Sequence, residues 1–194
     1  MCDPVDPRTV SRRAVVVGAG ALAAAATVGT PGSAAAQPAQ PLPDLAIVPR
    51  AGWAGDLPVR GELSVEAPGD VRFLLVHHTA SGNDYGPDDA VALLRSFYDL
   101  HTGEKGWSDL AYNFLVDRYG VVYEGRSGSL ERPVRGDATG GSQGFAQLAC
   151  FVGDFTAELP TLEAHASMTK LLAWLADTYD VDTTPGATTT FVSR

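Results

Sequence analysis

The sequence predicts an α/β fold, a single domain in which helices flank a mixed central β-sheet. Two observations predict it. Four short apolar segments alternate with polar turns, and two longer segments carry apolar side chains at helical spacing, in the order β-α-β-β-β-α. The composition agrees, because a chain of 194 residues with 45% hydrophobic and 19% charged residues suits one folded domain.

The first half of the domain contributes one strand and one helix. Residues 71–77 are mostly apolar and predict a strand that is buried on both faces. Pro87 favours the start of a helix, and Asp88 and Asp89 stabilise the positive end of its dipole. Apolar side chains at near-helical spacing extend this helix until Gly103 ends it.

The second half contributes three strands and a second helix. Residues 112–116 and 121–123 flank a turn sequence at 117–120, which predicts a β-hairpin. Residues 146–155 predict another buried strand. Residues 162–179 carry one apolar stripe and predict an amphipathic helix. Together with the first half, these elements predict the mixed sheet.

The N-terminal region resembles an export signal. Arg12 and Arg13 precede an uncharged stretch rich in Ala and Gly, and a small-residue site suited to cleavage follows it. This order is typical of a secretory signal, and the paired arginines favour the Tat route. The stretch is too weakly apolar for a stable membrane span, which needs about 20 strongly apolar residues. We therefore expect a Tat-type signal at residues 1–36, a linker at residues 37–47 and a secreted mature protein.

The charge and the cysteine content indicate which binding partners and which cross-links to expect. The net charge of −9 argues against a nucleic-acid partner, because such proteins normally carry a basic face. Cys2 lies in the expected signal and leaves Cys150 alone, so no disulfide is expected within the mature chain. A segment of about 150 residues buries enough surface for a core without cross-links. We expect a monomer.

Two adjacent histidines are the first candidates for chemistry. His77 and His78 lie at the end of the first predicted strand, where α/β proteins often keep their sites. Strand neighbours point to opposite faces, so at most one of the two can face a given pocket. In the alternative interpretation, one histidine covers the core and the other is solvated. Tyr112 also has a packing interpretation, because it shares a strand face with Phe114 and Val116.

Five segments together resemble the peptidoglycan recognition protein and type-2 N-acetylmuramoyl-L-alanine amidase family. They are VPRAGW at 48–53, VHHTA at 76–80, GWSDLAYNF at 106–114, VYEGR at 122–126 and FVGDF at 151–155. The resemblance extends from about residue 48 to the last predicted helix. Its specificity comes from the order of the segments, because any one of them alone would be a weak signal.

The resemblance implies a Zn²⁺-dependent enzyme that hydrolyses the amide between the lactyl group of N-acetylmuramic acid and L-alanine in peptidoglycan. His77 matches the family's first zinc ligand, and Tyr112 matches the catalytic tyrosine beside the metal-bound water. Zinc with three protein ligands keeps a fourth position open and lowers the pKa of bound water to about 7. The positions implied to contact muropeptides are His78, Thr79, His101, Trp107, Asn113 and Arg126.

The sequence also departs from the family pattern. The family's second histidine and its third ligand, usually a cysteine, follow the last helix, and this chain stops before them. His165 and Cys150 are poor substitutes, since the first is expected to face solvent and the second to lie in the core. We therefore expect the amidase domain at 48–194 to be truncated at its C-terminus and the 194-residue chain to be inactive. Ser127 and Gly128 stand where the family reads the third stem residue, which leaves the preferred stem peptide open.

Two other functions compete with the amidase. A non-catalytic peptidoglycan-binding module would use the same fold without the full ligand set. A serine hydrolase is suggested by the G-x-S-x-G pattern at 140–144, because Ser142, Asp154 and His165 follow the order of a catalytic triad. That pattern must follow a strand and open a helix, and here a predicted strand follows it. The serine hydrolase is therefore disfavoured.

Overall fold

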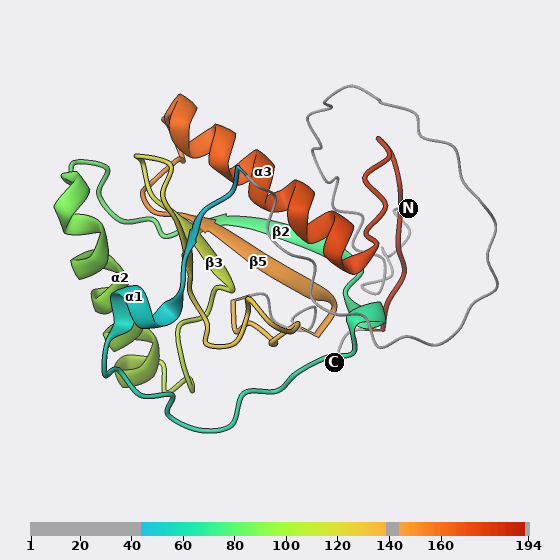
Figure 1. Cartoon of the computed structure of the whole chain (residues 1–194), viewed down its shortest axis with the longest axis horizontal. Coiled ribbons are helices and arrows are strands. Elements are labelled where there is room, and N and C mark those ends of the chain that lie inside the picture. Colours follow the sequence, from blue (N-terminus) through green and yellow to red (C-terminus); the bar gives the residue numbers. More distant parts are fainter. Residues whose placement is uncertain (1–43, 139–143, 193–194) are drawn as a thin grey trace, which may run out of the picture.

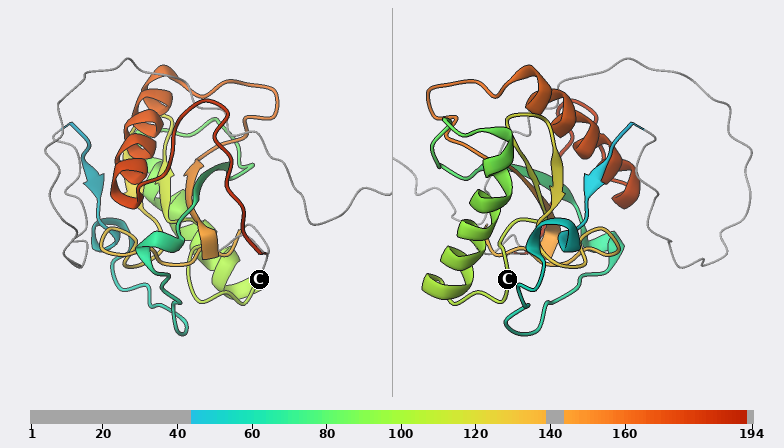
Figure 2. Two further views of the ribbon diagram at one scale, coloured as in Figure 1. Left: turned by 90° about the vertical axis from the view of Figure 1, so that its right-hand side faces the viewer. Right: turned by 60° about the vertical axis from the view of Figure 1, so that its left-hand side comes forward.

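The computed structural model describes residues 44–138 and 144–192 and shows one α/β domain in three layers. A five-stranded sheet lies between helix α3 on one face and helices α1 and α2 on the other (Figures 1 and 2). The strands are β1 (Ile47–Val48), β2 (Phe73–His78), β3 (Phe114–Val116), β4 (Val122–Glu124) and β5 (Ala146–Phe151). The helices are α1 (Arg50–Ala54), α2 (Ala90–Asp99) and α3 (Leu162–Tyr179), with short helical turns η1 (Pro68–Asp70), η2 (Pro87–Asp89) and η3 (Leu100–Glu104). The predicted fold class is confirmed.

The sheet is mixed, and its strand order is β1-β4-β3-β5-β2. β3 and β4 form the predicted antiparallel hairpin, whereas β2, β5 and β3 run parallel to one another. The register places His77 beside Cys150 and Cys150 beside Leu115. Residues in register share a face of a sheet, so these three side chains lie on one face.

The sheet separates two hydrophobic clusters. The cluster against α3 includes Phe114, Val116, Ala149, Phe151, Met168, Leu171 and Trp174. The cluster against α2 includes Trp53, Leu94, Tyr98, Leu115, Tyr123 and Cys150. Tyr112 packs against this second cluster, so the prediction that it shares a face with Phe114 and Val116 is wrong. The reason is that Tyr112 precedes β3 in an irregular segment, where strand alternation does not apply.

Two predicted elements differ in the structure. β2 is half-buried instead of buried on both faces, because it lies at the edge of the sheet and Val76 is 49% exposed. The helix that was expected to end at Gly103 continues past it, since α2 passes directly into η3, a turn with π-helical bonding. By contrast, α3 has the predicted bounds, and β5 begins where predicted and ends at Phe151.

The structure describes only the last residues of the region to which the N-terminal predictions apply. The expected signal at residues 1–36 lies outside the described residues, as does most of the linker. The linker ends earlier than residue 47, because Leu45 packs in the core and Ile47 pairs with Val122 in the sheet. Within 44–138 and 144–192, no helix combines the length and apolar character that crossing a membrane requires.

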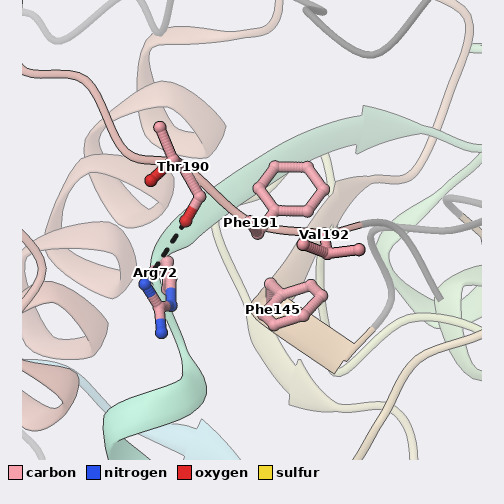
Figure 3. A pocket seen from close by; sticks show the side chains of 5 residues that line it. All are labelled: Arg72, Phe145, Thr190, Phe191 and Val192. Carbon is pink, nitrogen blue, oxygen red and sulfur yellow. Dashed lines mark hydrogen bonds between the residues drawn. The ribbon is translucent and has the colours of Figure 1, made fainter.

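The segment that follows α3 returns to the amino-terminal end of β2 and β5. Phe191 packs against Phe73 and Phe145, with ring centroids 5.2 and 5.1 Å apart. A cavity of about 310 Å³ there is lined by Arg72, Phe145, Thr190, Phe191 and Val192 (Figure 3). It lies at the opposite end of β2 from His78, so none of the predicted site residues lines it.

Candidate functional site

Four ring side chains meet on the α2 side of the sheet. The ring centroid of Tyr112 lies 5.8 Å from that of His77 and 5.7 Å from that of His101, and the ring of His101 lies 5.0 Å from that of Trp107. The four come from β2, η3 and the irregular segment between η3 and β3. We call His77, Tyr112, His101 and Trp107 the aromatic cluster. The structure therefore brings together four of the predicted site residues.

His101 is held in a defined orientation by the π-helical turn η3. Its carbonyl accepts a hydrogen bond from the backbone N–H of Trp107 at 2.9 Å, and its Nδ1 accepts one from the N–H of Ala111 at 3.2 Å. Burial lowers the pKa of His101 to about 4, and the positive charges of Lys105 and Arg126 act in the same direction. The imidazole is therefore neutral at physiological pH.

Tyr112 is fixed through its backbone and its phenol. Its carbonyl accepts the N–H of Arg126 at 2.8 Å, and a Cβ on Gly125 would collide with that carbonyl. The close approach of the two segments thus requires glycine at 125. Burial raises the pKa of the Tyr112 phenol, and the neighbouring Cys150 thiol raises it further. The phenol stays protonated and can donate a hydrogen bond.

A buried ion pair supports the segment that carries Trp107 and Tyr112. Arg50 Nη2 lies 2.8 Å from Asp109 Oδ1, and the Asp109 side chain is fully buried. Asp109 also accepts the backbone N–H of Leu110 at 2.7 Å and of Ser127 at 2.9 Å. The interpretation of the sequence missed this pair. Arg50 and Asp109 do lie inside two of the motif segments, but a charged residue in a motif does not reveal which partner it meets.

A polar cavity of about 300 Å³ adjoins the aromatic cluster at Trp107. It is lined by Glu62, Ser64, Gly106, Trp107, Ser108, Arg126, Arg135 and Asp137. Arg126 is only 4% exposed, and its Nη1 lies 2.6 Å from Asp137 Oδ2. Its buried Nε has no hydrogen-bond partner among the described residues. Two predicted substrate-binding residues, Trp107 and Arg126, thus line one cavity.

Three other predicted substrate-binding residues lie apart from the aromatic cluster. His78 Nδ1 accepts the N–H of Phe155 at 3.0 Å, and Thr79 Oγ1 accepts the N–H of Gly153 at 2.9 Å. Both contacts join the end of β2 to the loop that follows β5. Asn113 is fully buried, and both its amide oxygen and its amide nitrogen are hydrogen-bonded within the domain. In this structure all three side chains stabilise the fold. His77 and His78 do point in different directions, as strand alternation predicts.

The described residues do not fit a catalytic zinc by themselves. Such a site needs three protein ligands, and no group of three His, Cys, Asp or Glu side chains within 44–138 and 144–192 could hold a metal ion. The Nδ1 lone pair of His101 is directed at the N–H of Ala111. Cys150 is completely buried, and burial raises the pKa of its thiol, so it remains protonated. Of the residues that the family pattern implies as zinc ligands, His77 lies within the described part of the chain.

The structure does not support a serine hydrolase. Ser142 lies outside the described residues, so its own position gives no test. The segment after it leads directly into strand β5, whereas a nucleophile elbow leads into a helix. Asp154 and His165 are both exposed, one in the loop after β5 and the other on α3. A buried carboxylate that orients a histidine is therefore missing from this pair.

Comparisons with known proteins agree with this architecture. A family model described as N-acetylmuramoyl-L-alanine amidase matches residues 67–192. Peptidoglycan-recognition protein LE of Drosophila melanogaster is 34% identical over 128 residues, which are 66% of this chain and 35% of that protein. N-acetylmuramoyl-L-alanine amidase of Homo sapiens is 38% identical over 120 residues, which are 60% of this chain and 19% of that protein. The chain thus spans about a third or less of the length of these two relatives.

A solved structure shows the same fold. Peptidoglycan recognition protein-LE in complex with tracheal cytotoxin, a monomeric diaminopimelic acid-type peptidoglycan, superposes with a TM-score of 0.61 and 32% sequence identity. The superposition covers 71% of this chain and 77% of that chain. With this fold and a family model that matches more than half of its residues, the chain belongs to the N-acetylmuramoyl-L-alanine amidase family that includes the peptidoglycan recognition proteins.

Proposed function

We propose that this chain recognises peptidoglycan fragments, or muropeptides, at the aromatic cluster. The observation that carries the proposal is the convergence of His77, Tyr112, His101 and Trp107 beside a polar cavity, on the fold of a peptidoglycan-recognising family. Aromatic faces bind the apolar faces of sugars and peptides, while a few fixed polar groups set orientation. The cluster and the cavity supply both kinds of contact.

The ligand class follows from the cavity and from a relative. The cavity is lined by two arginines and two carboxylates, so it complements a ligand that carries both signs of charge. The structure of protein-LE holds a diaminopimelic acid-type peptidoglycan, whose stem peptide carries ammonium and carboxylate groups. We therefore take a monomeric muropeptide of this type as the ligand to test first.

Amide hydrolysis is the second candidate function. It would cleave the bond between the lactyl group of N-acetylmuramic acid and L-alanine, and the observation that favours it is the protonated phenol of Tyr112 beside His77. A phenol so placed can donate a hydrogen bond to an oxyanion. The family's chemistry also needs Zn²⁺, and the described residues offer His77 without the two further ligands of a catalytic site. Recognition requires no such ligands and is the function that the site supports best.

Binding and cleavage can be separated in one experiment on the 194-residue chain. Calorimetry would measure the affinity for the muropeptide before and after treatment with a chelator, and mass spectrometry would detect a released stem peptide. Recognition predicts binding that survives chelation without cleavage. Retained zinc together with stem-peptide release would instead establish the amidase, and absence of binding would overturn both.

A matched pair of variants tests the location of the site. Trp107→Ala removes a half-buried ring from the cluster and should weaken binding about 30-fold, since a central aromatic contact is often worth about 2 kcal/mol. His165→Ala on the exposed face of α3 serves as the control and should bind like the parent chain. Equal affinities for both variants would show that the ligand binds elsewhere.

We also propose that the protein is exported by the Tat route and works outside the cell. The support is the Arg12-Arg13 pair followed by a weakly apolar stretch in the sequence. Peptidoglycan lies outside the cytoplasmic membrane, so export would bring the protein to its proposed ligand.

A further inference from the structure

The backbone on both sides of Arg126 is held by buried side chains. The carbonyl of Gly125, in the preceding peptide group, accepts a hydrogen bond from Arg50 Nη1 at 2.6 Å. The N–H of Ser127, in the following peptide group, donates to Asp109 Oδ2 at 2.9 Å. Because a residue has only two soft backbone dihedrals, fixing both peptide groups also fixes the direction in which Arg126 leaves the backbone.

Both of these anchors lead to the guanidinium group of Arg50. Its Nη1 donates to the Gly125 carbonyl, and its Nη2 lies 2.8 Å from Asp109 Oδ1. Arg50 is only 8% exposed, and its guanidinium carbon lies 5.0 Å from the ring centroid of Trp53 and 5.5 Å from that of Tyr98. A guanidinium group holds its five N–H donors in a rigid plane, so one side chain can serve two partners at once.

A second buried carboxylate fixes the backbone of Arg50. Glu124 Oε2 accepts the N–H of Arg50 at 2.8 Å, and Glu124 Oε1 accepts the N–H of Gly128 at 3.0 Å. Arg50 is the first residue of α1, whereas Gly128 lies in the loop that follows β4. Glu124, which is 6% exposed, therefore joins α1 to the loop that carries Arg126.

We propose that Arg50 is a positioning residue, which aims Arg126 at the bound muropeptide and does not line the cavity itself. The inference rests on the proposed function and deepens it, because it gives α1 a part in recognition. Arg126 Nη1 donates to the Leu110 carbonyl at 3.0 Å and lies 2.6 Å from Asp137 Oδ2. These contacts and the open Nε donor of Arg126 depend on where its backbone lies, so the affinity should depend on Arg50.

A conservative substitution tests the planar fork of Arg50. Arg50→Lys keeps the positive charge, but a single ammonium group cannot hold both partners in the same geometry. It should bind a monomeric diaminopimelic acid-type muropeptide about 10-fold more weakly than the parent chain in calorimetry. Arg95→Lys is the matched control, since Arg95 donates to the last two carbonyls of α1 and does not line the cavity. It should bind like the parent chain, and urea unfolding verifies that both variants fold.

A double-mutant cycle separates positioning from support of the fold. Arg126→Met should weaken binding about 30-fold, as for a central arginine contact, and adding Arg50→Lys should weaken it no further. A combined loss of about 300-fold would show that Arg50 does not act through Arg126, and an unchanged affinity of Arg50→Lys would leave it a role in stability alone. Either result overturns the inference. If Arg50→Lys does not fold, Asp109→Asn replaces it in the cycle, because a single amide oxygen cannot serve both Arg50 and Ser127.

The orientation of Arg126 is measurable without any ligand. In a ¹H–¹⁵N spectrum, the Nε–H signal that disappears in Arg126→Met should shift in Arg50→Lys and keep its position in Arg95→Lys. An unshifted signal in Arg50→Lys would overturn the inference whatever the affinities are. If the parent chain binds no muropeptide, the proposed function fails and the role of Arg50 in recognition fails with it, whereas the spectrum still decides whether Arg50 orients Arg126.

Discussion

The burial of a neutral histidine makes the stability of this domain depend on pH in a predictable direction. Folded His101 has a pKa of about 4, whereas an unfolded histidine titrates at about 6.5. Between these values the unfolded chain binds more protons than the folded one, so the free energy of unfolding falls as the pH falls. The stabilisation is fully present above about pH 6.5 and is lost towards pH 4.

The magnitude follows from the two pKa values. Because the His101 side chain is only 7% exposed, solvent screening reduces the effect little. Between about pH 7.5 and about pH 4.5, His101 alone should cost the folded state about 2.5 kcal/mol. Urea unfolding at a series of pH values would measure it, with His101→Asn as the non-titrating variant that still accepts from Ala111.

The comparison must isolate this one residue, since carboxylates also titrate in the same range. The difference in unfolding free energy between the parent chain and His101→Asn removes their contribution, and it should shrink by about 2.5 kcal/mol over that interval. His165→Asn, which replaces an exposed histidine, controls for the loss of an imidazole as such. Parallel curves for the parent chain and His101→Asn would refute the assignment of a buried neutral ring.

Three further predictions follow from other parts of the chain. Arg50→Met leaves the buried Asp109 without its cation and should lower the free energy of unfolding, measured by urea titration, by about 3–5 kcal/mol. A smaller loss in the double variant Arg50→Met, Asp109→Leu would confirm that the two side chains act as a pair. Tyr112→Phe should keep muropeptide affinity, but any amide hydrolysis should slow by about 10² in a mass-spectrometric assay, and an unchanged rate would leave the phenol a packing role. Lysine at both Arg12 and Arg13 should retain the precursor inside the cell, as measured by fractionation; unchanged secretion would exclude Tat dependence.

Local sequence patterns were sufficient to predict the elements that form between residues close together in the chain. The stripe of apolar residues predicted where α3 begins and ends, and the turn sequence between β3 and β4 predicted their hairpin. The edge position of β2 was not predictable in this way, because it depends on parallel pairing with β5, some seventy residues further along the chain. Composition cannot distinguish an apolar strand at the centre of a sheet from one at its edge.

The candidate site was predictable in its members but not in its assembly. Motif resemblance identified the four members of the aromatic cluster, and it also nominated Asn113, which is completely buried and hydrogen-bonded within the fold. A motif marks a residue that the fold or the function requires, and the sequence does not say which of the two applies. The hydrogen bond between His101 and Ala111 and the ion pair of Arg50 and Asp109 depend on how the chain folds, so they emerge only from the structure.

The irregular backbone of the site explains why buried polar side chains pack against it. Tyr112 and Trp107 belong to a segment without helix or strand, whose backbone N–H groups have no regular partners and must be satisfied by side chains. Within this segment Asp109 accepts the N–H of Leu110 and His101 accepts that of Ala111, and Asp109 also accepts the N–H of Ser127 from the segment after β4. The same imidazole belongs to the aromatic cluster, at which we propose that the ligand binds. Because support and recognition share His101, a substitution there should change the affinity and the pH dependence of stability together.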